Sequence, residues 1–149
     1  MNRLLLIISV FGFFISCKSE HPDLKTAFEI FTDAQNLKQT LLSSSADLIN
    51  QAKIVDGRIR NENPEDVFAI TEVYNHLEAV EKALKSAEGT ERAVPGHEKE
   101  SNGIRTTEAN LTPAQVLMQQ KSYRDNLMSI KNDLDAAATL LNQLKTKVK

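Results

Sequence analysis

The stretch Leu111-Thr112-Pro113-Ala114-Gln115-Val116 is the clearest helix start in this chain of 149 residues. Thr112 and Gln115 have the spacing of a capping box, and Leu111 and Val116 have the spacing of a hydrophobic staple. Pro113 fits the first helical position. From here to the end of the chain, residues at alternating intervals of three and four are apolar, with one polar exception: Val116, Gln120, Tyr123, Leu127, Ile130, Leu134, Ala137, Leu141, Leu144 and Val148. This pattern predicts a long amphipathic helix.

Two further helices are predicted upstream of this stretch. Residues 22–60 carry a stripe with the same spacing, in which Lys38 and Ser45 are the polar interruptions: Leu24, Ala27, Phe31, Ala34, Lys38, Leu41, Ser45, Leu48, Ala52, Val55 and Ile59. A shorter helix of roughly 25 residues then shows Val67, Ile70, Val73, Tyr74, Leu77, Val80, Leu84 and Ala87. We expect Asn63 to cap this middle helix and Gly89 to end it as its C′ residue.

Residues 90–110 separate the second and third predicted helices. They contain Pro95-Gly96, Asn102-Gly103 and several charges, and they show no helical or strand period. A loop of this length inside a compact domain is uncommon and is usually functional or disordered.

The composition agrees with a helical protein. The chain has six Phe, two Tyr and no Trp, and its single cysteine rules out an intrachain disulfide. We therefore predict an all-α fold, an antiparallel three-helix bundle with long helices and one long loop between helices two and three. A long coiled-coil oligomer is the alternative, and homodimerisation through leftover apolar surface stays open. The formal net charge of −2 gives no reason to expect nucleic-acid binding.

The N-terminal residues have the pattern of a secretory signal peptide. Arg3 precedes an apolar run that is too short to span a bilayer, and the only cysteine, Cys17, follows it. The sequence Phe14-Ile15-Ser16-Cys17 resembles a bacterial lipobox, with Phe14 where most lipoboxes have Leu. That resemblance implies cleavage by signal peptidase II after residues 1–16 and attachment of lipid, including palmitate, to Cys17. Cleavage nearby by an ordinary signal peptidase, with an incidental Cys17, is the alternative.

This resemblance extends to a broader class of protein. The run Ile15-Ser16-Cys17-Lys18-Ser19 is similar to the start of Borrelia-type surface lipoproteins of spirochaetes. It implies a lipidated cysteine with a short tether at residues 17–21, a bundle domain at 22–149, and an outer-membrane protein exposed on the cell. Typical ligands of that group are host or vector macromolecules, such as complement regulators or matrix components. The alternative is a periplasm-facing structural lipoprotein, because the final Lys147-Val148-Lys149 resembles the end of the murein lipoprotein.

Two candidate binding surfaces follow from the predicted arrangement. A tether of about five residues spans less than ~18 Å, so helix one starts near the membrane. The far end of the bundle then gathers Arg58, Arg60, Lys145, Lys147 and Lys149, which could meet a sulfated glycan or an acidic host protein. Alternatively, these cations only offset helix dipoles. At the near end, the shorter middle helix leaves Phe28 and Phe31 either as an exposed apolar patch or covered by the long loop.

Catalytic and metal motifs are weak in this sequence. His21, His76 and His97 are scattered, and the segment after His97 lacks the second histidine of a zinc-protease helix. We therefore expect no enzyme activity, no metal and no cofactor. The regular Leu- and Ala-rich stripes predict a filled core rather than a small-molecule carrier.

Overall fold

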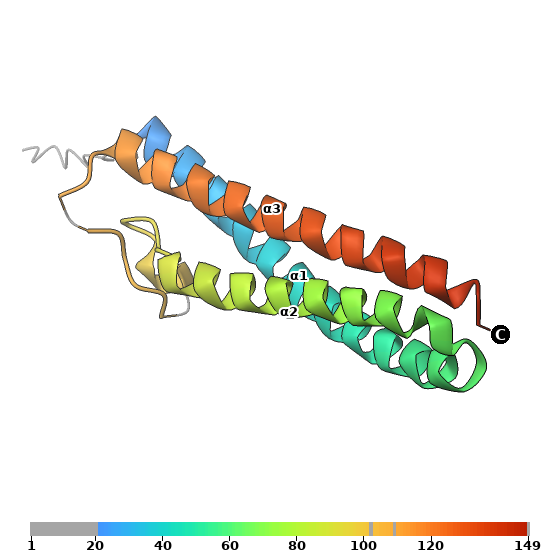
Figure 1. The fold of residues 1–149 in the computed structure, drawn as a ribbon. Coiled ribbons are helices and arrows are strands. Elements are labelled where there is room, and N and C mark those ends of the chain that lie inside the picture. Colours follow the sequence, from blue (N-terminus) through green and yellow to red (C-terminus); the bar gives the residue numbers. More distant parts are fainter. Residues whose placement is uncertain (1–20, 102, 109, 149) are drawn as a thin grey trace, which may run out of the picture.

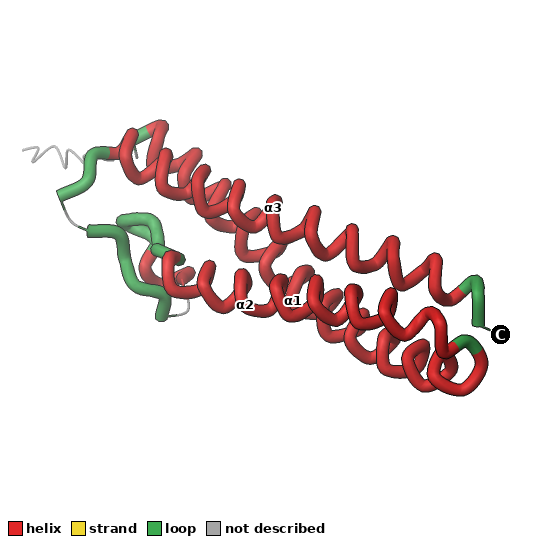
Figure 2. The backbone as a smooth tube through the Cα atoms, in the orientation of Figure 1, coloured by secondary structure: helices red, strands yellow, loops and turns green. Residues whose placement is uncertain are grey.

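The computed structural model describes residues 21–101, 103–108 and 110–148. The predicted signal peptide, the predicted lipidation site Cys17 and the terminal Lys149 therefore lie outside the described residues. Three long helices pack along their lengths (Figure 2): α1 (Pro22–Glu62), α2 (Val67–Thr90) and α3 (Pro113–Lys145). Two short 3-10 helices, η1 (Pro64–Asp66) and η2 (Glu98–Ser101), lie in the connections. Since the described residues form no strand beyond one isolated bridge, the all-α prediction is confirmed.

The helices lie side by side in an elongated molecule (Figure 1). At one end, which we call the base, Leu24 of α1 and Val116 of α3 share a small apolar cluster. At the other end, the tip, the Asn63 side-chain amide donates a 3.0 Å hydrogen bond to the Lys147 carbonyl. The turn between α1 and α2 therefore lies beside the end of α3.

The helix ends follow local rules in part. The predicted capping box is confirmed: the Gln115 amide N–H donates to Thr112 Oγ1 at 3.3 Å, and the Thr112 amide N–H donates to Gln115 Oε1 at 2.8 Å. The predicted cap at Asn63 is wrong, because η1 intervenes and the Asn63 side chain bonds Lys147 instead. The predicted end at Gly89 is also wrong. Helix α2 continues through Gly89 to Thr90 and stops where Glu91 turns extended, with φ −62° and ψ 134°.

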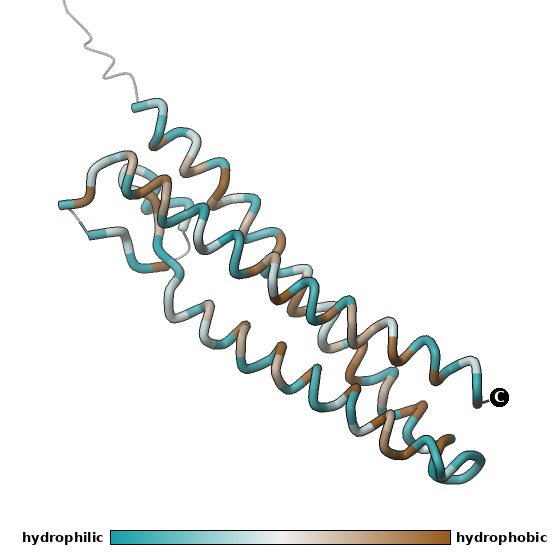
Figure 3. Tube along the Cα trace, turned by 45° about the horizontal axis from the view of Figure 1, so that its top comes forward, coloured by the Kyte–Doolittle hydropathy of each residue, from teal (hydrophilic) through white to brown (hydrophobic). Residues whose placement is uncertain are grey.

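The core consists of the predicted stripes. All ten residues of the α3 stripe are buried, including the polar Gln120, which is 1% exposed. Figure 3 shows hydrophobic residues recurring along each helix between hydrophilic ones. A packed interior of this kind supplies most of the stability of helices that would be marginal alone.

The connection between α2 and α3 is folded against the base. The Ala93 amide N–H donates to the Arg105 carbonyl at 2.9 Å, and the Thr107 amide N–H donates to the Ala93 carbonyl at 3.0 Å. These bonds bring the two halves of the connection together. Ala93 and Val94 are fully buried. Because α1 has 41 residues and α2 only 24, this loop takes the place that α2 does not reach along the start of α1.

Candidate functional site

The loop covers the two phenylalanines that were candidates for an exposed patch. Phe31 is only 3% exposed and packs with Ala27, Val94 and Val116. The Phe28 ring is partly exposed and stacks on the His97 ring, with centroids 3.7 Å apart. Of the two arrangements considered for this surface, the structure has the one in which the loop folds over its own core.

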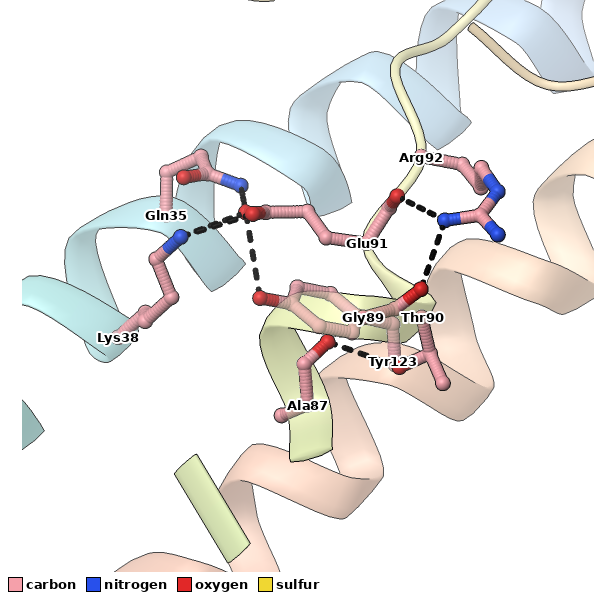
Figure 4. A network of polar contacts seen from close by, with 8 residues as sticks. All are labelled: Gln35, Lys38, Ala87, Gly89, Thr90, Glu91, Arg92 and Tyr123. Atoms are coloured by element: carbon pink, nitrogen blue, oxygen red, sulfur yellow. Dashed lines mark hydrogen bonds and ion pairs between the residues drawn. The ribbon is translucent and has the colours of Figure 1, made fainter. Parts of the chain in front are cut away.

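A buried polar cluster holds the start of this loop in place. We call it the Glu91 junction, and it consists of Gln35 and Lys38 from α1, Glu91, and Tyr123 from α3 (Figure 4). Lys38 Nζ lies 2.8 Å from Glu91 Oε2 and 3.0 Å from Oε1, Tyr123 OH donates to Oε1 at 3.2 Å, and the Gln35 amide donates to the same oxygen. The Glu91 side chain is 6% exposed and that of Lys38 is 15% exposed. One carboxylate therefore joins the end of α2 to both other helices.

The Glu91 junction also fixes the protonation of its phenol. Burial raises the pKa of the Tyr123 hydroxyl well above its ordinary value, and the negative charge and hydrogen bond of Glu91 raise it further. Tyr123 therefore stays a neutral donor to the carboxylate at physiological pH. These contacts tie the start of the loop to α1 and α3.

A second polar tie lies one turn toward the base on α3. The Gln120 side-chain nitrogen Nε2 donates to the Arg92 carbonyl at 2.9 Å. The side-chain oxygen Oε1 of Gln120 is buried and has no hydrogen-bond partner among the described residues. Gln120 therefore interrupts the apolar stripe of α3 because its side chain holds the loop at Arg92.

An open groove of about 460 Å³ lies between α1 and η2, beside the Glu91 junction. Three of its polar side chains are already bonded within the chain. The Thr32 hydroxyl donates to the Phe28 carbonyl, the Ser101 hydroxyl donates to the Glu98 carbonyl, and Lys38 is paired with Glu91.

The structure divides the predicted basic cluster at the tip into two kinds of cation. Arg60 Nε lies 2.8 Å from Asp56 Oδ1, and Lys147 Nζ lies 2.6 Å from Asp66 Oδ1. Both cations are therefore neutralised by a neighbouring carboxylate. Asp56 also acts on Tyr74 of α2, where burial is the main cause of a raised pKa and the Asp56 charge adds to it. The Arg60 pair therefore lies on the side of α1 that faces α2.

Arg58 and Lys145 are cations of the second kind, which are not paired with a carboxylate of the described residues. Arg58 is exposed and makes no hydrogen bond or ion pair with the described residues. Lys145 Nζ donates to the neutral amide oxygens of Gln51 and Asn142, and no carboxylate of the described residues pairs with it. Both residues line a shallow groove of about 300 Å³ where α1 and α3 meet at the tip.

This tip groove includes a residue that the sequence pattern did not single out. Ile54 is 62% exposed, although it is a large apolar side chain, and it lines the groove together with Val55 and Val148. Its position directly before the stripe residue Val55 was the available signal, because an extra apolar residue beside a complete stripe is not needed for the core.

The described part of the chain holds neither a cluster of metal ligands nor a membrane-spanning helix. No group of three His, Cys, Asp or Glu side chains in residues 21–101, 103–108 and 110–148 is placed to hold a metal ion. None of the helices in the same residues combines the length and apolar character needed to cross a bilayer. Comparison with known protein families, curated proteins and solved structures gives no match.

Proposed function

We propose that this chain is a lipid-anchored lipoprotein of the cell surface whose helical domain binds a host or vector macromolecule. The observation that carries the proposal is the lipobox-like Phe14-Ile15-Ser16-Cys17, with only four residues between the single cysteine and the start of α1 at Pro22. Three acyl chains on Cys17 would hold the protein far more firmly than the marginal binding of one chain.

The helices are proposed to run up, down and up in an antiparallel bundle. The bond from Asn63 to Lys147 at the tip and the cluster of Leu24 and Val116 at the base support this arrangement. With the anchor at Cys17, the base and its loop would stand next to the membrane. The tip groove would then face away from the cell, where a large partner can reach it.

The single native cysteine makes this orientation measurable. Once Cys17 is lipidated, a cysteine introduced elsewhere is the only free thiol in the chain. We place it in one variant at the tip (Glu62→Cys) and in another in the base loop (Glu108→Cys), since both positions are exposed. Intact cells are then treated with a small and with a bulky membrane-impermeant maleimide.

The proposal predicts that the small reagent labels both variants on intact cells and that the bulky reagent labels Glu62→Cys much faster. Labelling that needs permeabilised cells would refute surface display and favour a periplasm-facing lipoprotein. Faster bulky labelling of Glu108→Cys would refute the orientation. As a control, Cys17→Ala should lose incorporation of labelled palmitate; if the label persists, Cys17 is not the lipidation site.

A further inference from the structure

We propose that the tip groove between α1 and α3 is a docking site for an acidic peptide segment that places one apolar side chain between two carboxylates. The groove is lined by Gln51, Ile54, Val55, Arg58, Lys145 and Val148. This inference rests on the proposed binding function and names the chemistry of its partner.

The charges at the groove are the first reason. Arg58 and Lys145 flank it without a carboxylate partner in the described chain, whereas Arg60 and Lys147, on the sides that face α2, are each paired with an aspartate. Among the described acidic residues of α1, neither Asp56 nor Glu62 forms an ion pair with Arg58. Asp47, one turn before Gln51, accepts a hydrogen bond from the Gln51 side chain at 2.5 Å. Two cations beside one groove therefore lack compensation, and a carboxylate partner would supply it.

The apolar floor is the second reason. Ile54 leaves most of its side chain in water, while Val55 and Val148 below it are only 3% and 6% exposed. Covering an aliphatic side chain of this kind is favourable by roughly 25 cal/mol per Å² of apolar surface removed from water. A sulfated glycan would use the cations but would gain little from Ile54. The combination therefore favours a peptide with both kinds of group.

The test uses the protein isolated from cells in a mild detergent. The probe is a fluorescein-labelled peptide with a photo-reactive leucine that is flanked on each side by two glutamates, and its matched control has glutamine in place of each glutamate. Binding is measured by fluorescence anisotropy, and cross-links made on illumination are located by mass spectrometry. Because the protein is purified, a failure here leaves the labelling of intact cells as an independent result.

We expect saturable binding of the acidic peptide, with cross-links in residues 51–58 and 145–148. Arg58→Gln, Lys145→Gln and Ile54→Ser should each weaken binding by about tenfold, the effect of losing one charge-assisted or apolar contact. Arg60→Gln and Lys147→Gln are the matched controls, with the same change of charge at paired positions. They should change affinity less than about twofold, because each of these cations is already neutralised by its own aspartate.

Four results would overturn the proposal. The first is absence of saturable binding, and the second is equal binding of the glutamine peptide. The third is tighter binding of a heparin fragment that does not respond to Ile54→Ser, which would mark a site for sulfated glycans. The fourth is a dimer in sedimentation that Ile54→Ser dissociates, which would assign the groove to a second copy of the chain.

Discussion

Replacing Glu91 by alanine should destabilise the whole domain, because this carboxylate compensates the charge of Lys38 and accepts from three side chains at once. Glu91→Ala leaves the Lys38 ammonium, only 15% exposed, without its counter-charge. It also leaves the Tyr123 hydroxyl and the Gln35 amide without their acceptor. Removing one partner of a buried ion pair costs about 3–5 kcal/mol. Since Lys38 retains some access to water, we expect a value of about 3 kcal/mol.

The measurement is urea denaturation followed by far-UV circular dichroism. A loss of that size is a large part of the roughly 5–15 kcal/mol that stabilises a typical domain. Lys131→Met is the matched control, because it breaks the exposed pair with Asp135 and should change stability by less than about 0.5 kcal/mol.

A double-mutant cycle separates the pair from its surroundings. Lys38→Met with Glu91→Leu removes both charges together, so the double variant should be more stable than the sum of the single losses predicts, by about 2 kcal/mol. Hydrogen exchange should also show faster opening of residues 91–108 in Glu91→Ala. The reasoning is refuted if Glu91→Ala costs less than about 1 kcal/mol, or if the two substitutions are additive.

Three further predictions concern packing, pH and backbone conformation. Leu127→Ala empties a fully buried site and should cost about 2–5 kcal/mol in urea denaturation, whereas Met128→Ala, at a 44% exposed neighbour, should cost less than about 1 kcal/mol. The raised pKa of Tyr123 means that its stabilisation is complete below pH 10.0, the ordinary value, and is lost as the pH rises above it. Stability of the unmodified protein should therefore fall more steeply above that pH than stability of Tyr123→Phe; parallel curves would contradict this. Gly57→Ala, at a helical position with open space around it, should increase the free energy of unfolding by about 0.5–1 kcal/mol and so raise the melting temperature. Gly96→Ala, at φ 90°, should decrease the free energy of unfolding by about 1–2 kcal/mol and so lower the melting temperature.

The sequence pattern predicted the three helices and most of their buried faces. A residue every three or four positions must lie on one face of a helix, so the α3 stripe from Val116 to Val148 could be identified without any knowledge of its partners. Even the polar positions Lys38 and Gln120 were placed on the inner faces. Their reason for being there was not predictable, because the groups that they contact lie in a stretch without a period.

Glu91 is the clearest example of that limit. It follows Lys38 by 53 residues and belongs to a segment that looked like an open loop. Ion pairs over such a separation depend on how the chain returns, and a local pattern carries no information about that return. The misassigned ends have the same cause. Asn63 and Gly89 obey capping rules that hold when nothing else competes, but at Asn63 the carbonyl of Lys147, just after the end of α3, takes the side chain.

The candidate site shows a similar division. The basic residues at the tip were predicted from helix direction, but the separation into paired and unpaired cations depends on where Asp56 and Asp66 lie. Ile54 could not be recognised as exposed from its sequence neighbours alone. The orientation of the helices around it decides that 62% of its side chain remains in contact with water.

The contacts between α1 and α3 also set the order in which the chain can fold. Gln51 and Lys145 are 94 residues apart, and Asn63 and Lys147 are 84 apart. Local pairing of α1 with α2 requires only the short connection at Asn63, so these two helices can pack together while later residues are still being synthesised. Closing so large a loop is entropically slower, and until α3 arrives the α1 stripe has no partner on that side. A chain that stops before Pro113 should therefore depend on chaperones to avoid aggregation.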